Sequence, residues 1–185
     1  MGLPISDRPD EALVRDAMSG QSEAFNVLVR RWERKVYSFL VYLTARPEEA
    51  FDMCQEAFLS AYRHLGQLKD PHKFPQWLFR IARNTAHSRA RQEREEETSL
   101  NDLEGAGDSS GARVGEAGQW ERGELKILVE KALAALPFEQ REAIVLKFYQ
   151  GFKLAEIAEI QGCPLSTVKT RVYSGFEQLR KFIES

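Results

Sequence analysis

Apolar side chains in the first hundred residues recur every three or four positions, which is the spacing of one face of an α-helix. The longest such run lasts for about five turns and consists of Phe25, Leu28, Val29, Trp32, Val36, Phe39, Leu40 and Leu43. Gly20 predicts the end of a shorter helix over residues 11–18, and Pro47, followed by two glutamates, predicts the start of the next one. Neither β-type alternation nor an internal repeat is evident, so this half is predicted to be all-helical.

Two further helices are predicted to begin at Pro47 and at Pro75, on either side of a loop over residues 68–74. The first would end at Gly66 and turn apolar side chains inward, namely Phe51, Cys54, Phe58 and Tyr62. The second would bury Leu78, Ile81 and Ala82, while its opposite face carries Arg80, Arg83, His87 and Arg91. A basic helix face is usually only solvated, so this pattern alone is weak evidence for a nucleic-acid partner.

The last sixty residues predict four shorter helices, over residues 124–136, 140–149, 154–161 and 165–182. The turn Gly162-Cys163-Pro164 separates the last two, which favours a helix-turn-helix. The outward positions of the final helix carry the hydroxyl and basic side chains that contact phosphates and base edges in a major groove. These are Ser166, Thr167, Lys169, Thr170, Arg171 and Ser174.

Between the two halves, glycine and polar residues crowd positions 101–119, where there is little to bury. Residues 93–124 contain ten acids and three arginines, a net charge of −7, so the rest of the 185-residue chain carries +5 of the total of −2. The low overall charge therefore hides two mildly basic halves. We expect two domains, at residues 1–97 and 123–185, joined by a flexible acidic linker over residues 98–122.

The sequence lacks the residues that several classes of function require. No apolar run approaches the ~20 residues that span a bilayer, and the N-terminus lacks the pattern of a secretory signal. The two cysteines and three histidines show no metal-ligand spacing, and no nucleophile–base motif or phosphate loop is present. We therefore expect a cytoplasmic protein that is not an enzyme, has no cofactor or metal and does not insert into a membrane. A conventional helix-turn-helix regulator is the main alternative at this point.

Four motifs together resemble one family. Gly20-Gln-Ser-Glu-Ala-Phe-Asn-Val-Leu-Val-Arg-Arg-Trp, Asp52-Met-Cys-Gln-Glu-Ala-Phe and Phe74-Pro-Gln-Trp-Leu-Phe-Arg-Ile-Ala-Arg-Asn-Thr-Ala resemble parts of region 2 of extracytoplasmic-function (ECF) sigma factors. Leu154-Ala-Glu-Ile-Ala-Glu-Ile-Gln-Gly-Cys-Pro-Leu-Ser-Thr-Val-Lys-Thr-Arg-Val, preceded by Ala135-Leu-Pro, resembles their region 4. The resemblance is strongest to the envelope-stress sigma factors. It implies an all-α protein of two small helical domains that directs core RNA polymerase to promoters.

The resemblance also implies three sets of contact residues. Asp52, Gln55, Glu56 and Phe58 match positions that dock onto the clamp helices of the polymerase β′ subunit, while region 4 would meet the β flap. The minus-ten element would be contacted by the specificity loop and the following helix, through Leu68, Lys73, Phe74, Arg80, Arg83, Asn84, His87 and Arg91. The minus-thirty-five element would be contacted by Ser166, Thr167, Lys169, Thr170, Arg171 and Ser174. Trp77 is expected to stay in the core.

Three departures from the family pattern affect these expectations. Phe51 replaces an acid beside the docking motif, and Leu68 replaces an aromatic residue at the start of the specificity loop. Ser174-Gly175-Phe176 replaces the Arg-Ala-Arg of many members, which predicts an unusual or weaker upstream element. A degenerate sigma-like protein that binds polymerase without initiating therefore stays open as an alternative.

Two regulatory hypotheses come from the resemblance. The acidic linker occupies the position of the segment that threads the polymerase active-site cleft, although a solvated tether explains its composition equally well. An anti-sigma factor that clamps the two domains together would hide both the polymerase-binding and the DNA-binding surfaces.

Overall fold

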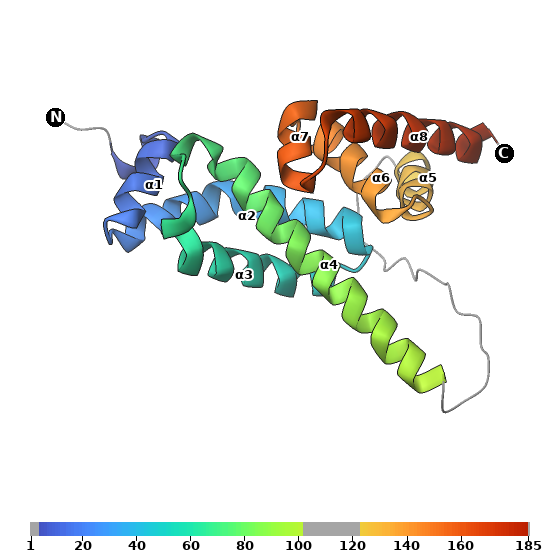
Figure 1. The fold of residues 1–185 in the computed structure, drawn as a ribbon, viewed down its shortest axis with the longest axis horizontal. Coiled ribbons are helices and arrows are strands. Elements are labelled where there is room, and N and C mark those ends of the chain that lie inside the picture. Colours follow the sequence, from blue (N-terminus) through green and yellow to red (C-terminus); the bar gives the residue numbers. More distant parts are fainter. Residues whose placement is uncertain (1–3, 102–122, 185) are drawn as a thin grey trace.

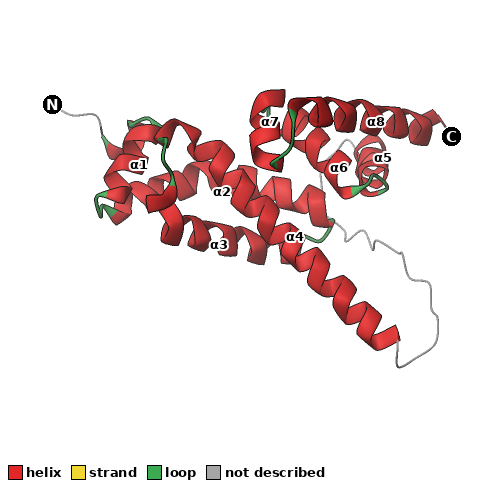
Figure 2. Ribbon diagram, viewed as in Figure 1, coloured by secondary structure: helices red, strands yellow, loops and turns green. Residues whose placement is uncertain are grey.

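A computed structural model describes residues 4–101 and 123–184, and every regular element within these ranges is helical (Figure 2). The first range contains α1 (Asp10–Met18), α2 (Ser22–Thr44), α3 (Pro47–His64) and α4 (Phe74–Asn101), with short 3-10 turns at Ile5–Asp7, Leu65–Gln67 and Pro71–Lys73. The second contains α5 (Gly123–Ala134), α6 (Phe138–Ile144), the π-helical turn η4 (Val145–Tyr149), α7 (Leu154–Gln161) and α8 (Leu165–Glu184). The all-helical prediction is confirmed.

The ends of the helices follow local signals. Gly20 and Gly162 adopt positive φ angles of 98° and 62° after α1 and α7, a conformation that suits glycine because it has no Cβ. Pro47 opens α3, and Glu48 and Glu49 lie in its first turn, where carboxylates oppose the positive end of the helix dipole. Several predicted boundaries shift by a few residues, and α4 continues past the predicted domain end at residue 97 to Asn101. Residues 102–122, which hold most of the predicted linker, lie outside the described ranges.

The core of the N-terminal half lies between α2, α3 and α4. The predicted apolar stripe of α2 supplies buried Leu28, Val36, Phe39 and Leu40. Phe79 of α4 is fully buried and packs against Phe39, with ring centroids 5.2 Å apart. Burial of an aromatic ring of this size is a major favourable contribution to folding.

The C-terminal half packs α6 against α8 at very close range. Gly175 is buried in α8, and a Cβ placed on it would come within 2.6 Å of Ile144 Cδ1 in α6. A larger residue here would require the Ile144 side chain to shift, and this position faces the interior instead of DNA. Phe176 is exposed and stacks edge-on against Phe148 at 4.8 Å.

The two halves pack directly on each other: α5, α6 and η4 contact α2, and α7 contacts α4, while α8 lies on the outer side of α6 and α7 (Figure 1). Phe152, just before α7, meets Phe79 at a centroid distance of 4.9 Å, and Tyr149 meets Tyr42 of α2 at 4.4 Å. One continuous apolar cluster thus spans both halves. The C-terminal part of α4 projects away from this contact.

Within the described ranges, no helix is both long and apolar enough to cross a membrane.

Candidate functional site

The outer face of α3 carries the predicted docking residues. Asp52, Gln55 and Glu56 are all exposed, and their spacing of three and four residues places them on one side of the helix. Phe51 is 56% exposed beside them, which is unusual for a large aromatic side chain. It borders a hollow of about 690 Å³ between α2 and α3, together with Tyr37. This face combines carboxylates, an amide and an apolar recess, as protein interfaces do.

Phe58 differs from the other predicted docking residues because its side chain is buried. It packs in the core and also lines the floor of the hollow. Its burial gives Phe58 a role in the core, and a contact between Phe58 and polymerase stays a prediction.

The loop before α4 also contains two buried residues. Leu68 and Phe74 are 5% and 0% exposed. Phe74 therefore lies in the core, contrary to the expectation. Leu68 is also buried but lines a hollow of about 430 Å³ together with Lys69, Asp70, Lys73, Trp77 and Arg80, so its contact with a DNA base stays a prediction. Trp77 is half-buried and packs against the core, as expected, although its edge reaches this hollow.

The basic face of α4 is divided between exposed and covered residues. Arg80, Asn84 and Arg91 are exposed. Arg83 is covered: its side chain is 16% exposed, and its Nε lies 2.7 Å from Glu142 Oε1 of α6. His87 is half-buried and packs its ring on Phe138 at 4.2 Å.

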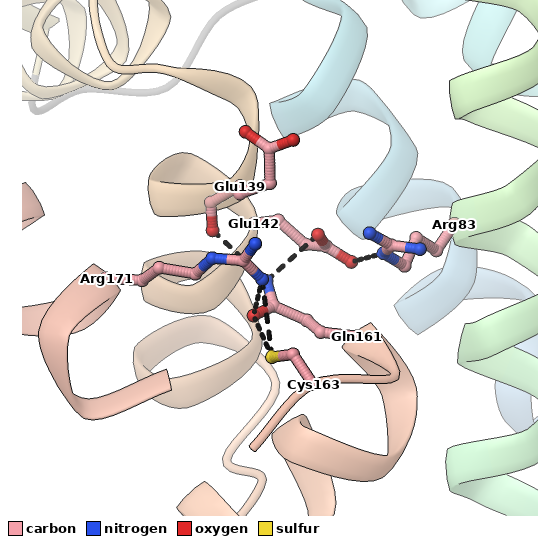
Figure 3. A network of polar contacts seen from close by, with 6 residues as sticks. All are labelled: Arg83, Glu139, Glu142, Gln161, Cys163 and Arg171. Carbon is pink, nitrogen blue, oxygen red and sulfur yellow. Dashed lines mark hydrogen bonds and ion pairs between the residues drawn. The ribbon is translucent and has the colours of Figure 1, made fainter. Parts of the chain in front are cut away.

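Glu142 is at the centre of a polar network that joins α4 to the helix-turn-helix (Figure 3). Its side chain is fully buried, and its Oε2 accepts a hydrogen bond of 2.9 Å from Gln161 Nε2. Burial raises the pKa of the Glu142 carboxyl, while Arg83 and Gln161 act against the rise. A buried carboxylate is tolerated only when it is paired in this way.

Arg171 faces the same network instead of DNA. Its Nη1 donates to Gln161 Oε1 at 2.9 Å and lies 3.4 Å from Cys163 Sγ. The expected outward position of Arg171 is thus corrected, because the guanidinium is used to tie α8 to the turn. The other predicted residues of α8 remain accessible in part: Ser166, Lys169 and Thr170 are exposed, while Thr167 and Ser174 are half-buried.

Two glutamates of α7 accept hydrogen bonds from the loop before α4 and from the first turn of α4. Glu159 accepts from Lys73 Nζ at 2.9 and 3.0 Å, and Glu156 accepts from Gln76 Nε2 at 3.0 Å. Acids and amides at helical spacing ordinarily face solvent. No local signal in the sequence therefore singled out these partners, namely Glu142, Glu156, Glu159 and Gln161.

Among the described residues, no group of three or more histidine, cysteine, aspartate or glutamate side chains is placed to hold a metal ion.

Comparison with known proteins matches the two halves to two family models, sigma-70 region 2 over residues 28–96 and sigma-70 region 4 over residues 126–179. The chain is 34% identical to the ECF RNA polymerase sigma-E factor of Escherichia coli K12, over 92% of each chain.

Two solved structures share the fold. One is the sigma factor RpoE in complex with the anti-sigma factor NepR from Bartonella quintana, with a TM-score of 0.72 and 26% identity over 86% of this chain and 96% of that one. The other is CnrH in complex with the cytosolic domain of CnrY, with a TM-score of 0.71 and 25% identity over 95% and 97%.

Proposed function

The chain belongs to the ECF sigma factors, the non-enzymatic subunits that bind core RNA polymerase and promoter DNA, and we propose how its surfaces divide that work. We assign polymerase docking and the minus-ten element to a region 2 domain of residues 1–97, and the minus-thirty-five element to a region 4 domain of residues 123–185. The segment 98–122 would tether them. Family membership replaces the alternative of a conventional helix-turn-helix regulator.

We assign core polymerase binding to the outer face of α3. Asp52, Gln55 and Glu56 present two carboxylates and an amide side by side, and Phe51 and the adjacent recess supply apolar area. An interface of this kind gains orientation from the polar groups and affinity from the desolvated aromatic side chain. The β′ clamp helices are the proposed partner of this face, and the β flap that of region 4.

We assign the minus-ten element to the loop of residues 68–73 and to the basic face of α4. Lys73, Arg80 and Arg91 carry charge for phosphates, and the Asn84 amide can donate to and accept from a base edge. Arg83 and His87 join this set only when α6 no longer covers them. A base flipped toward the hollow beside Trp77 would regain its lost stacking energy there.

The minus-thirty-five element is assigned to α8, through Ser166, Thr167, Lys169, Thr170 and Ser174. Arg171 is a positioning residue that holds α8 against Gln161. Because this surface contains a single cation, Lys169, its contribution to affinity is expected to depend only weakly on salt concentration.

Regulation by an anti-sigma factor in the cytoplasm is part of the proposal. It is supported by the two solved structures named above, in which one similar protein is bound to NepR and the other to CnrY.

The test is transcription in vitro, with purified chain and core bacterial RNA polymerase on a pool of promoter fragments. Gln55→Ala/Glu56→Ala is compared with Gln21→Ala/Glu23→Ala, which removes the same two side-chain types from exposed positions of the same domain. Defined transcripts from the wild type and the control, lost in the first variant, would support the proposal. Tight core binding by the wild type without transcripts would indicate a degenerate sigma factor. Core binding by the first variant that is as tight as that of the control would contradict the assignment of α3.

A further inference from the structure

Three arginines gather around a small hollow that none of the surfaces described above includes. The hollow has a volume of about 300 Å³ and lies where the end of α2, the start of α3, the middle of α4 and the start of α6 come together. Its charged residues are Arg46, Arg89, Arg141 and Glu49. Glu49 pairs with Arg46 at 2.5 Å. Three arginines against one glutamate leave a charge of +2, which belongs to Arg89 and Arg141.

Arg141 has no carboxylate to balance its charge. Its two Nη atoms donate to the backbone carbonyls of Leu43, Ala134 and Leu136, at 2.8, 2.9 and 3.1 Å. Its Nε is buried and has no acceptor, and no carboxylate in the described ranges pairs with it. Burial lowers the pKa of this guanidinium. A buried donor without an acceptor is a feature that a bound ion or water can explain.

Arg89 adds a second cation from the opposite side of the hollow. It is exposed on α4 and makes no hydrogen bond or ion pair within the part of the chain that the structure describes. Met53, Leu136 and Phe138 supply apolar walls beside the two arginines. The hollow therefore combines a charge of +2 with apolar area, and its volume is at the lower end of the range for ligand pockets.

These features select a class of ligand. A phosphate monoester carries a charge of about −1.5 to −2 at neutral pH, which balances two arginines, whereas a monocarboxylate balances one. The planar guanidinium also matches the oxygens of a phosphate through paired hydrogen bonds. The organic part of an ester can pack against the apolar walls, for which inorganic phosphate has no matching group.

We propose that this hollow binds a small phosphate monoester, held by Arg89 of α4 and Arg141 of α6. The inference does not depend on which surfaces contact polymerase and DNA, and it adds a small-molecule ligand to a protein whose other partners are macromolecules. Because each half contributes one arginine, the complete site exists only in the folded chain with both halves in place. A bound ester would therefore raise the thermal stability of the protein in proportion to its concentration and affinity.

The main test is calorimetric titration of the full chain with three probes in a buffer free of phosphate. Phenyl phosphate and benzoate share a ring and differ in the charged group, and inorganic phosphate lacks the ring. We expect phenyl phosphate to bind at least ~tenfold more tightly than benzoate, because only phosphate engages both arginines. Inorganic phosphate should bind more weakly than phenyl phosphate. Equal affinities for phenyl phosphate and benzoate, or no binding of phenyl phosphate, would overturn the proposal, and equal affinity for inorganic phosphate would overturn its assignment to an ester.

A pair of matched variants locates the site. Arg89→Gln and Arg15→Gln each remove one exposed arginine from a helix of the N-terminal half, and Arg15 does not line the hollow. Arg89→Gln is expected to weaken binding of phenyl phosphate by ~tenfold or more, since a charge-assisted hydrogen bond is lost. Arg15→Gln should leave the affinity unchanged. Equal affinities of the two variants would overturn the proposal.

A second measurement reads Arg141 in the wild-type protein. The Nε–Hε resonance of Arg141 in a ¹⁵N-labelled sample is identified by its loss in Arg141→Lys. Titration with phenyl phosphate should shift this resonance with the affinity found by calorimetry, because the buried donor gains an acceptor. A resonance that does not move at saturation would overturn the proposal. Neither readout uses polymerase or DNA, so its failure is distinguishable from failure of the proposed function.

Discussion

The outer face of α3 and the basic face of α4 belong to the same half of the molecule but are presented in opposite ways. Asp52, Gln55 and Glu56 of α3 are exposed. Arg83 of α4 is paired under α6, and Lys73 is paired with α7. The surface assigned to polymerase is thus ready for its partner, whereas the surface assigned to DNA is partly occupied.

This difference suggests an order of events. A face that needs no rearrangement can associate at an ordinary rate, while a face that must first be uncovered binds with an affinity reduced by the fraction of open molecules.

The strongest way to break the comparison is to remove a buried ring of α4 itself. Phe79→Ala is expected to lower the free energy of unfolding by about 3–5 kcal/mol, because Phe79 is fully buried between Phe39 and Phe152. Leu59→Ala on α3 is the control and is expected to change it by less than about 0.5 kcal/mol, since Leu59 is 49% exposed. Chemical denaturation followed by circular dichroism measures the free energy of unfolding of both variants. Similar losses of stability in Phe79→Ala and Leu59→Ala would contradict the burial of Phe79.

A milder change separates the packing of region 4 from the contact between the halves. Gly175→Ala is expected to cost about 1–3 kcal/mol, because its Cβ would come within 2.6 Å of Ile144 Cδ1. Adding Ile144→Val removes the Cδ1 methyl group that the new Cβ would meet, and this should recover part of the lost stability. Thermal unfolding of the single and double variants checks this, and a double variant no more stable than Gly175→Ala would argue against the close contact.

The comparison is sharpened by cross-linking the two halves at a point that lies away from both faces. Tyr42→Cys/Tyr149→Cys, joined by a short cleavable bis-maleimide in a Cys163→Ser background, fixes two side chains that already meet at 4.4 Å. The locked protein is expected to bind core polymerase through α3 but to lose about tenfold or more in transcription, a change of about 1.4 kcal/mol or more. Cleaving the linker should restore activity. Equal losses of core binding and transcription would contradict an independent α3 face.

The smallest expected effect is ionisation of the phenols at unusually high pH where Tyr42 packs on Tyr149. Burial, together with Tyr149 and Glu130, raises the pKa of Tyr42 to about 12, and burial also raises the pKa of Tyr149. Because the folded-state pKa of Tyr42 is raised, its stabilising contribution is complete below its unfolded value near 10 and is lost as pH rises toward 12. Ultraviolet difference titration should show late ionisation of both phenols, and the contribution of Tyr42 should be absent in Tyr42→Phe. A wild-type curve identical to that of the variant would contradict burial of this ring.

Much of the molecule could be predicted from its sequence because the signals are local. The apolar stripe of α2, the start of α3 at Pro47 and the end of α7 at Gly162 depend on spacing and on backbone preference, which a sequence displays directly. The Asp52–Phe58 motif indicated the α3 face for the same reason. However, periodicity could not separate buried Phe58 from exposed Phe51. Both are apolar residues of α3, and the spacing of apolar residues does not tell a side chain that faces the core from one that faces a partner.

The sequence by itself determined the helices, their two groups and the family motifs, since each depends on residues a few positions apart. Only the tertiary structure decided that Glu142 is buried against Arg83 and that Arg171 turns inward to Gln161. It also decided that Gly175 packs closely against Ile144. The physical reason is the same in each case. The partner comes from another helix, and whether a charged or small side chain faces water, DNA or its own chain is settled by which surfaces are brought together.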